Sequence, residues 1–206
     1  MFTAFLKHLF PRLVLSRNLK ITYTFCLGGM AFTVFLLLIV TGCLLLFYYT
    51  PSPDNAYKSI LFIEETVFGG KLIRNIHRMG SHFLLILIFL HILRVLLTGS
   101  FKFRKYNWIV GMFLLILVLF EGYTGYLLPM DQLAYWATQT GMELFKIFPL
   151  GGFIVEKILI PDGVGGPLTL SRFYAFHVFV VPLTLMILCV IHFYKIRKDK
   201  GVLPYL

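Results

Sequence analysis

Histidines inside long apolar stretches are the residues of this sequence whose type and spacing best support chemistry. Ionisable side chains are rare in such stretches and are usually functional. One stretch carries His77 and His91, 14 residues apart. Another carries His177 and His192, 15 residues apart. At 100° and 1.5 Å per residue, each pair lies roughly on one face of its helix, and its members are separated by about 21–22 Å along the axis.

Two such helices running in the same direction bring paired imidazoles together at two depths, which suits six-coordinate haem iron with one axial nitrogen from each helix. A single intramembrane histidine more often bonds a neighbouring backbone or side-chain group, but four histidines matched in depth disfavour that explanation. His82 lies about 140° round the helix from His77 and is not predicted as a ligand. The sequence therefore predicts two haem sites, formed by His77 with His177 and by His91 with His192.

Glycines repeat the same spacing on two further apolar stretches. Gly28 and Gly42 lie 14 residues apart on one, and Gly111 and Gly125 lie 14 residues apart on the other. Glycine lets a bulky planar ligand or a neighbouring helix approach the backbone closely. Helix packing explains single glycines equally well, but it does not predict the shared spacing. Each haem is therefore expected to lie beside two histidines and two glycines.

Basic residues near each depth are candidates for pairing with haem propionates. Taken singly, such residues are more often loop charges or side chains that snorkel to the membrane surface. The candidates are Arg74, Arg78, Arg94, Lys102 and Arg197.

The composition indicates that the apolar stretches cross a membrane. Hydrophobic residues make up 59% of the 206 residues, charged residues 14%, and the mean hydropathy is +0.85. Soluble chains are about a quarter charged. A spanning helix needs about 20 mostly apolar residues, so we expect an all-α bundle of four transmembrane helices, over residues 23–49, 76–97, 108–128 and 173–194. Pro182 is expected to kink the last, and residues 134–148 are expected to form one or two short helices.

Charge predicts the orientation in the bilayer. Twelve of the 19 Lys and Arg lie before the first span, in the last turn of the second span (Arg94) and its connection to the third, and after the last span, with one acid, Asp199. Lys and Arg accumulate on the cytoplasmic side, so both termini are predicted to be cytoplasmic. The basic residues then form a collar that faces the membrane surface, and no nucleic-acid partner is expected.

The chain is predicted to have two parts. Residues 1–22 form an N-terminal cytoplasmic interfacial segment, in which residues 1–15 are either a short amphipathic helix or a flexible basic tail. That stretch lacks the cleavage site of a secretory signal. Residues 23–206 form the four-helix haem domain.

Short motifs lie within the predicted spans and at their borders. They are Cys26-Leu27-Gly28-Gly29, Thr41-Gly42, Phe47-Tyr48-Tyr49, Arg74-Asn75-Ile76-His77-Arg78, His91-Ile92-Leu93-Arg94, Gly125-Tyr126-Leu127-Leu128-Pro129, Asp131-Gln132, Tyr135-Trp136-Ala137 and Leu170-Ser171-Arg172-Phe173-Tyr174. Together they resemble cytochrome b, in the short form called cytochrome b6, from about residue 25 to the end of the chain. The 15-residue histidine step is similar to the b6 type, whereas mitochondrial-type cytochromes b use 14.

The resemblance implies an electron-transfer subunit of a quinol:cytochrome c or plastoquinol:plastocyanin oxidoreductase. In that family one quinol electron passes to a high-potential iron–sulfur and cytochrome c chain. The second crosses the membrane through two b haems, from an outer quinol oxidation site to a cytoplasmic-side quinone site, and contributes to proton translocation. Two alternatives stay open: a di-haem quinol-oxidising anchor of a different respiratory reductase, and a non-redox membrane subunit.

The implied partners are a Rieske iron–sulfur protein, a c-type cytochrome and a subunit IV-like chain, in a dimeric complex. The bacterial inner membrane is favoured, with the thylakoid membrane as the alternative. Two departures from the family pattern bear on these partners. Met130 replaces the usual Trp after Pro129, and the Pro-Glu-Trp-Tyr element that accepts a quinol proton is absent from the 206 residues. A partner must supply that element, or the chain serves a different complex.

Cys26 is the third candidate haem site. A lone cysteine at the end of a span is usually inert packing, and the sequence has no C-x-x-C-H attachment motif. In the family it resembles, however, the Cys of the Cys-Leu-Gly-Gly motif forms one thioether to an extra haem on the cytoplasmic side. The resemblance therefore implies a covalent c-type haem at Cys26.

Glu121 is an acid inside an apolar span, where ionisation is costly, so it is expected to be neutral at pH 7. It lies four residues before Gly125, near the predicted quinol pocket formed with Tyr126, Pro129 and Met130. It could relay a proton from quinol. The favoured alternative is a structural role, with Glu121 bonded to the hydroxyl of Tyr123 or Thr124.

Overall fold

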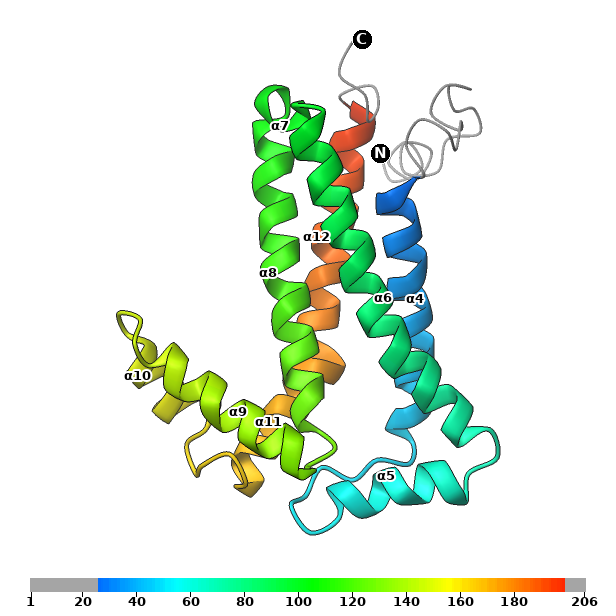
Figure 1. Ribbon diagram of the computed structural model, residues 1–206, viewed down its shortest axis with the longest axis vertical. Helices are drawn as coiled ribbons and strands as arrows, with labels where there is room; N and C mark the ends of the chain where they lie inside the picture. Colours follow the sequence, from blue (N-terminus) through cyan, green and yellow to red (C-terminus); the bar gives the residue numbers. More distant parts are fainter. Residues whose placement is uncertain (1–25, 199–206) are drawn as a thin grey trace, which may run out of the picture. The chain divides into compact units, whose positions relative to one another are not determined.

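The computed structural model describes residues 26–198, and every regular element in that range is a helix. Four helices are long and apolar enough to cross a membrane. They are α4 (Leu27–Leu46), α6 (Gly70–Leu97), α8 (Lys105–Leu127) and the continuous helix Pro167–Lys198, which comprises α11, η2 and α12 (Figure 1). The all-α prediction with four spans is confirmed.

The helix ends differ from the predicted limits by a few residues. The second and fourth spans each begin six residues earlier than expected, at Gly70 and Pro167. The first ends at Leu46, before the Thr50-Pro51 border. Hydropathy marks the apolar part of a helix, whereas the helix itself continues into polar turns. The predicted interfacial segment, residues 1–22, lies outside the described residues.

The chain forms two compact units, and each span contributes one part to each of them. The His91 unit comprises, within the described range, residues 26–36, 81–118 and 183–198, and it includes α7 (Ser100–Phe103). The His77 unit comprises residues 37–80 and 119–182. His91 and His192 therefore lie in one unit, and His77 and His177 lie in the other. The two predicted haem sites are thus built separately.

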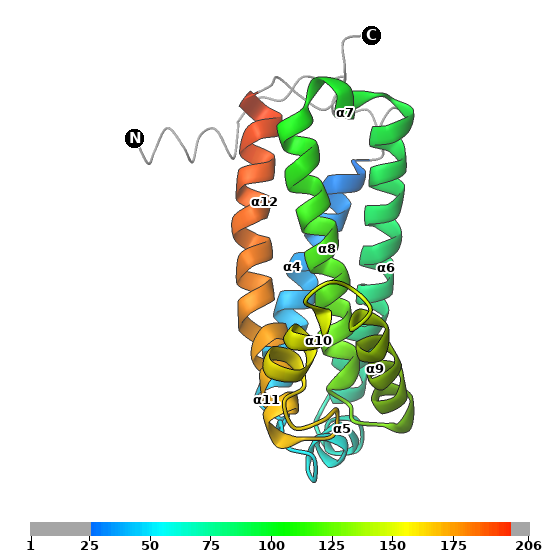
Figure 2. The ribbon, with the colours of Figure 1, turned by 90° about the vertical axis from the view of Figure 1, so that its left-hand side faces the viewer.

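Within residues 26–198, the other short helices all lie in the His77 unit. They are α5 (Ala56–Glu65), α9 (Gln132–Phe145), α10 (Gly151–Phe153) and η1 (Ile154–Leu159). Helices α9 and α11 both lie near the last turns of α8 in the two ribbon views (Figure 1 and Figure 2). The backbone N–H of Ala134 donates to Asp131 Oδ1 at 2.8 Å, which caps α9. The expected helix over residues 134–148 is confirmed, starting two residues earlier.

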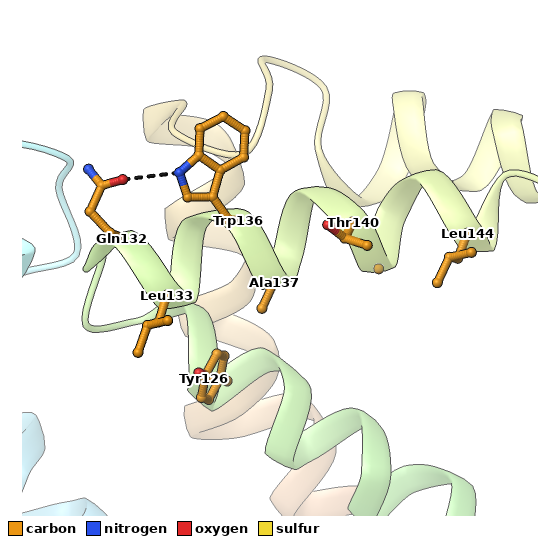
Figure 3. A pocket seen from close by; sticks show the side chains of 8 residues that line it. Tyr126, Gln132, Leu133, Trp136, Ala137, Thr140 and Leu144 are labelled. Carbon is orange, nitrogen blue, oxygen red and sulfur yellow. Dashed lines mark hydrogen bonds between the residues drawn. The ribbon is translucent and has the colours of Figure 1, made fainter.

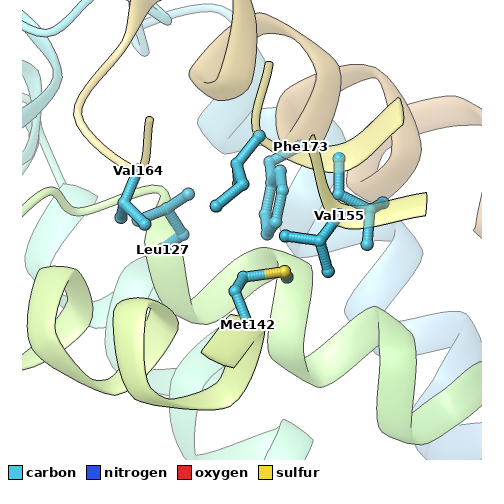
Figure 4. Close-up of a cluster of buried hydrophobic side chains, with 7 residues drawn as sticks. Leu127, Met142, Val155, Val164 and Phe173 are labelled. Atoms are coloured by element: carbon cyan, nitrogen blue, oxygen red, sulfur yellow. The ribbon is translucent and has the colours of Figure 1, made fainter. Parts of the chain in front are cut away.

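A hydrophobic cluster holds α9 and η1 against the ends of α8 and α11. Figure 4 shows Met142 of α9, Val155 of η1 and Phe173 of α11 converging on one another. Val155 and Phe173 are completely buried, and so is Leu127 at the end of α8. Burying one such side chain contributes about 1.5–3 kcal/mol, so this cluster fixes the segment between α8 and α11 without the bilayer.

Tyr49 joins the ends of three spans within the same unit. It follows α4, its O–H donates to the carbonyl of Leu128 at 2.7 Å, and its ring stacks on Tyr174 of α11 at 5.5 Å. Burial and the neighbouring Tyr174 raise the pKa of Tyr49 above its ordinary value. The phenol therefore remains a neutral hydrogen-bond donor at physiological pH.

The last span contains a π turn, η2 (Phe176–Val180), directly before α12 (Val181–Lys198). Proline lacks an N–H and clashes with the carbonyl four residues earlier, so the irregularity expected at Pro182 takes the form of this turn. A π turn accommodates one residue more than an α turn. The 15-residue step from His177 to His192 thus corresponds to 14 α-helical steps, the same as from His77 to His91 on α6.

Candidate haem sites

His77 and His177 form the upstream pair, so named because each precedes its partner histidine along its helix. Their ring centroids are 6.1 Å apart and the ring planes cross at 81°. A metal–imidazole bond is about 2 Å. Two such bonds to one ion, together with the distance from each nitrogen to its ring centre, add up to about the observed separation. The upstream pair therefore fits one iron between the two rings.

In each upstream ring, Nδ1, the nitrogen that would not bind the metal, makes a hydrogen bond within the protein. His77 Nδ1–H donates to Thr41 Oγ1 at 2.9 Å, and Thr41 in turn donates to the carbonyl of Leu37 at 2.9 Å. His177 Nδ1–H donates to the carbonyl of Glu121 at 3.0 Å. Metal-binding histidines commonly donate their second N–H in this way, which leaves Nε2 for the metal. Both rings are held in the tautomer that iron requires.

His91 and His192 form the downstream pair, on α6 and α12. Both rings are half-buried, and neither Nδ1 atom has a hydrogen-bond partner within residues 26–198. An unpaired buried polar atom is costly unless another group satisfies the ring. A haem would use one nitrogen of each ring, so the donor set of this pair also fits the group.

Each of the four predicted glycines lies against one of the four histidines. A Cβ added at Gly28 would meet His91 Cε1 at 3.2 Å, and one at Gly42 would meet His77 Cε1 at 3.2 Å. A Cβ at Gly111 would lie 3.5 Å from His192 Cε1. At Gly125 it would come within 2.9 Å of His177 Nδ1. The glycines thus make room for the imidazole rings, one glycine to each ring.

The donor set disfavours a metal held by protein alone. The described part of the chain has no group of three or more His, Cys, Asp or Glu side chains that could hold an ion. A porphyrin brings its own four nitrogens, so two axial histidines complete six-coordinate iron. Paired histidines without a third protein ligand are what such a cofactor needs.

Arg74, one predicted propionate partner, makes an ion pair within the protein. Its guanidinium donates to the carboxylate of Glu64 on α5. Lys102 Nζ lies 6.0 Å from the ring of Phe101. Propionate pairing of Arg74, Lys102 and the other basic candidates, Arg78, Arg94 and Arg197, stays a prediction.

Cys26 directly precedes α4, with an exposed side chain and a left-handed backbone at φ 47°. Its carbonyl accepts from the N–H of Met30 at 2.9 Å. A non-glycine residue in this conformation costs about 1–3 kcal/mol. It lies in the His91 unit, two residues before the glycine that seats His91. The position suits the covalent attachment that the sequence predicts, and the attachment itself stays a prediction.

Of the predicted quinol-pocket residues, Tyr126 borders a groove along α9 (Figure 3). Sequence reasoning missed most of its lining, in which Leu133 and Trp136 are 74% and 60% exposed. The Trp136 indole N–H donates to Gln132 Oε1 at 3.0 Å. Met130 instead packs against the hydrophobic cluster. The signal in the sequence that could have indicated this groove is an aromatic residue, Trp136, on the polar side of an amphipathic helix.

The side chain of Glu121 makes a contact different from the one expected. Tyr123 O–H donates to the carbonyl of Thr138 at 3.0 Å, and Thr124 Oγ1 donates to the backbone carbonyl of Glu121 at 2.9 Å. Neither hydroxyl bonds its carboxyl group. Glu121 Oε1 lies 3.2 Å from His177 Nδ1 instead. The predicted hydroxyl partner was wrong because residues close in sequence on a helix need not face the same neighbour.

Comparisons with known proteins identify the family of this chain. The family model described as Cytochrome b/b6/petB matches residues 13–200. The chain is 42% identical over 175 residues to cytochrome b6 of Heliomicrobium gestii, covering 84% of this chain and 82% of that one. It is 39% identical over 180 residues to the menaquinol:cytochrome c reductase cytochrome b subunit of Bacillus subtilis (strain 168), covering 86% and 80%.

A solved structure shares the fold. A chain of a hyperthermophilic respiratory Complex III superposes with a TM-score of 0.82 at 28% identity, over 89% of this chain and 49% of that one. This chain thus spans about half the length of that solved relative. The family model covers all four histidines, and the relatives at about 40% identity cover most of the sequence. The chain belongs to the cytochrome b/b6 family.

Proposed function

We propose that this chain is the transmembrane electron-transfer subunit of a quinol:cytochrome c or plastoquinol:plastocyanin oxidoreductase. The observation that carries the proposal is the repeated contact of one histidine with one glycine, present four times, twice in each compact unit, with the upstream rings 6.1 Å apart. Its relative in Bacillus subtilis is named as a subunit of a menaquinol:cytochrome c reductase. The histidine pairs supply what such a subunit needs, two haem sites in one helical domain.

The chain's own residues orient the ligands. Thr41 and the Glu121 carbonyl keep Nε2 of the upstream rings available, and Gly28 and Gly111 admit the downstream rings between the helices. When bound, b haems supply reversible one-electron redox chemistry. The excess of basic residues near the termini supports cytoplasmic termini, with the upstream pair toward the outer side and the downstream pair toward the cytoplasm.

The quinol oxidation site is proposed near the end of α8 on the outer side. Tyr126 borders the groove there, and Pro129 and Met130 follow it. Glu121 is a candidate for relaying a proton from this site. The second quinone site lies toward the cytoplasm, near the downstream pair. The proposed partners are a Rieske protein, a c-type cytochrome and a subunit IV-like chain, in a dimeric complex in the bacterial inner membrane.

The experiment is the redox spectrum of the purified protein. Reduced protein should show a b-type α-band at about 560 nm. The His91→Ala variant should lose the downstream haem and keep most of the upstream one, because the two pairs lie in separate units. His82→Ala is the matched control, since His82 is exposed on the same helix, and it should keep both. Unchanged spectra in His91→Ala would show that the pairing is wrong.

We also propose a third haem, attached to Cys26 by one thioether. The exposed thiol and the left-handed backbone at this residue support it. Denatured protein should then keep peroxidase-active haem on a gel, whereas b haems dissociate. Cys26→Ser should abolish that staining, and Cys43→Ser, a control within α4, should retain it. Wild-type protein without covalent haem would refute the attachment.

A further inference from the structure

Glu121 is the only acidic residue within the four spans of the described chain. Its side chain is 19% exposed, and Oε2 is buried without a hydrogen-bond partner among the described residues. A carboxyl group in an apolar span is expensive. The cost is offset at one atom only, Oε1, which lies 3.2 Å from Nδ1 of His177. The placement of Glu121 therefore has to be understood through that histidine.

The geometry separates two roles that Glu121 has toward the ring. His177 Nδ1–H points to two acceptors of the same residue, the backbone carbonyl at 3.0 Å and Oε1 at 3.2 Å. Thr124 Oγ1 lies further away, at 3.5 Å. The carbonyl is present whatever the side chain is, so it can fix the tautomer and the ring orientation alone. The carboxyl oxygen Oε1 adds a second acceptor, which depends on the side chain.

The other three histidines lack a comparable partner. His77 has the neutral hydroxyl of Thr41, and the downstream rings have no Nδ1 partner within residues 26–198. An acceptor on the distal nitrogen increases electron density at the nitrogen that binds the metal, and this favours the oxidised ion. Only one of the four predicted ligands is therefore polarised by a carboxyl group.

We infer that Glu121 is a positioning residue that acts through His177, strengthening this ligand through Oε1 and lowering the reduction potential of the upstream haem relative to the downstream one. The inference rests on the proposed function, because it requires a haem between His77 and His177. In this role the Glu121 side chain helps to set the reduction potential of the upstream haem and needs no contact with quinol.

The test is a redox titration of both haems in the purified protein. Glu121→Leu removes the second acceptor and should raise the midpoint potential of the upstream haem. Glu121→Gln keeps a neutral oxygen acceptor at the same reach, so it should leave the upstream potential closer to that of the wild type than Glu121→Leu does. The downstream haem should keep its potential in both variants, which provides a control within the same molecule.

A second control isolates the chemical change. Glu143→Gln on α9 alters an exposed carboxylate that pairs with Lys146 at 3.0 Å, and it should shift neither haem. An upstream potential that is unchanged in Glu121→Leu, or equal shifts of both haems, would overturn the inference. If Glu121→Leu loses the haem, Glu121→Ala, which also removes Oε1, decides in the same way. Wild-type protein that lacks the upstream haem would refute the proposed function instead, so the two failures are distinguishable.

Discussion

The upstream and downstream histidine pairs share the same glycine contacts but differ in the hydrogen bonds to their Nδ1 atoms. In both, a glycine of α4 admits a histidine of α6, and a glycine of α8 admits a histidine of the last span. In the upstream pair the protein also bonds the Nδ1 atom of each ring, whereas in the downstream pair neither Nδ1 has a partner among the described residues. Packing alone therefore places an imidazole ring, and hydrogen bonding in addition sets how strong a donor its other nitrogen is.

The upstream pair also has more protein packed around it than the downstream pair has. The His77 unit has its own hydrophobic cluster, four short helices and the hydrogen bond from Tyr49 to Leu128. The described part of the His91 unit has only the short α7 beside the spans. We expect the upstream pair to keep its geometry without haem better than the downstream pair does.

The largest effect is expected from changing helical register in the last span. Deletion of Ile187 from α12 leaves the π turn in place and rotates His192 about 100° away from its former face, so one haem should be lost. Deletion of Val180 instead removes the extra residue of the π turn and keeps 14 α-helical steps, so both haems should remain. Haem content per protein distinguishes the variants. Loss of a haem in the Val180 deletion would contradict the proposed role of the π turn.

Glycine substitutions should have graded effects. Gly125→Ala places a methyl group against the His177 ring at closer range than at any of the other three positions, so it should reduce upstream haem content most, at a cost of about 1–3 kcal/mol. Gly111→Ala has the most space and should reduce downstream haem least. Gly122→Ala, with open space at the added Cβ, is the control on α8. Equal losses in all three would mean that helix propensity, rather than ring contact, is the cause.

A smaller effect is expected from Thr41→Val. The change keeps the shape of the side chain and removes the acceptor for His77 Nδ1, a hydrogen bond worth about 0.5–1.5 kcal/mol. The upstream haem should bind somewhat more weakly, with a small rise in its midpoint potential, and the downstream haem should be unaffected. A shift confined to the downstream haem would contradict the assignment of these hydrogen bonds.

The smallest effect concerns acid stability in the His77 unit. Burial raises the pKa of Asp162, but hydrogen bonds from Thr169 and from the N–H of Leu168 outweigh it and hold the pKa below its ordinary value. Its contribution is therefore present above the ordinary Asp pKa and lost as the pH falls through the lowered one. Asp162→Asn should slightly lower thermal stability at neutral pH, with the difference shrinking in acid. If the difference in thermal stability between the wild type and Asp162→Asn grew in acid, the pKa of Asp162 would be raised by folding instead of lowered.

The sequence by itself was enough to locate the four spans and to predict that the four histidines form two pairs. A membrane span is required by a local quantity, the sum of transfer free energies over about 20 residues, and the helical period is fixed by backbone geometry. Spacings of 14 and 15 residues therefore indicate which helix face and which depth in the membrane each histidine occupies, without knowledge of tertiary contacts. The paired glycines followed from the same arithmetic.

Only the tertiary structure decided which groups meet. Glu121 and His177 are 56 positions apart, and Thr41 and His77 are 36 apart, so nothing in the local pattern of either segment names its partner. The same holds for Arg74 with Glu64, and for the pairing of each glycine with one imidazole. Hydrophobicity is nearly additive along a chain, but a hydrogen bond is directional and depends on two atoms brought within about 3 Å. That condition is set by helix packing, which no single span specifies.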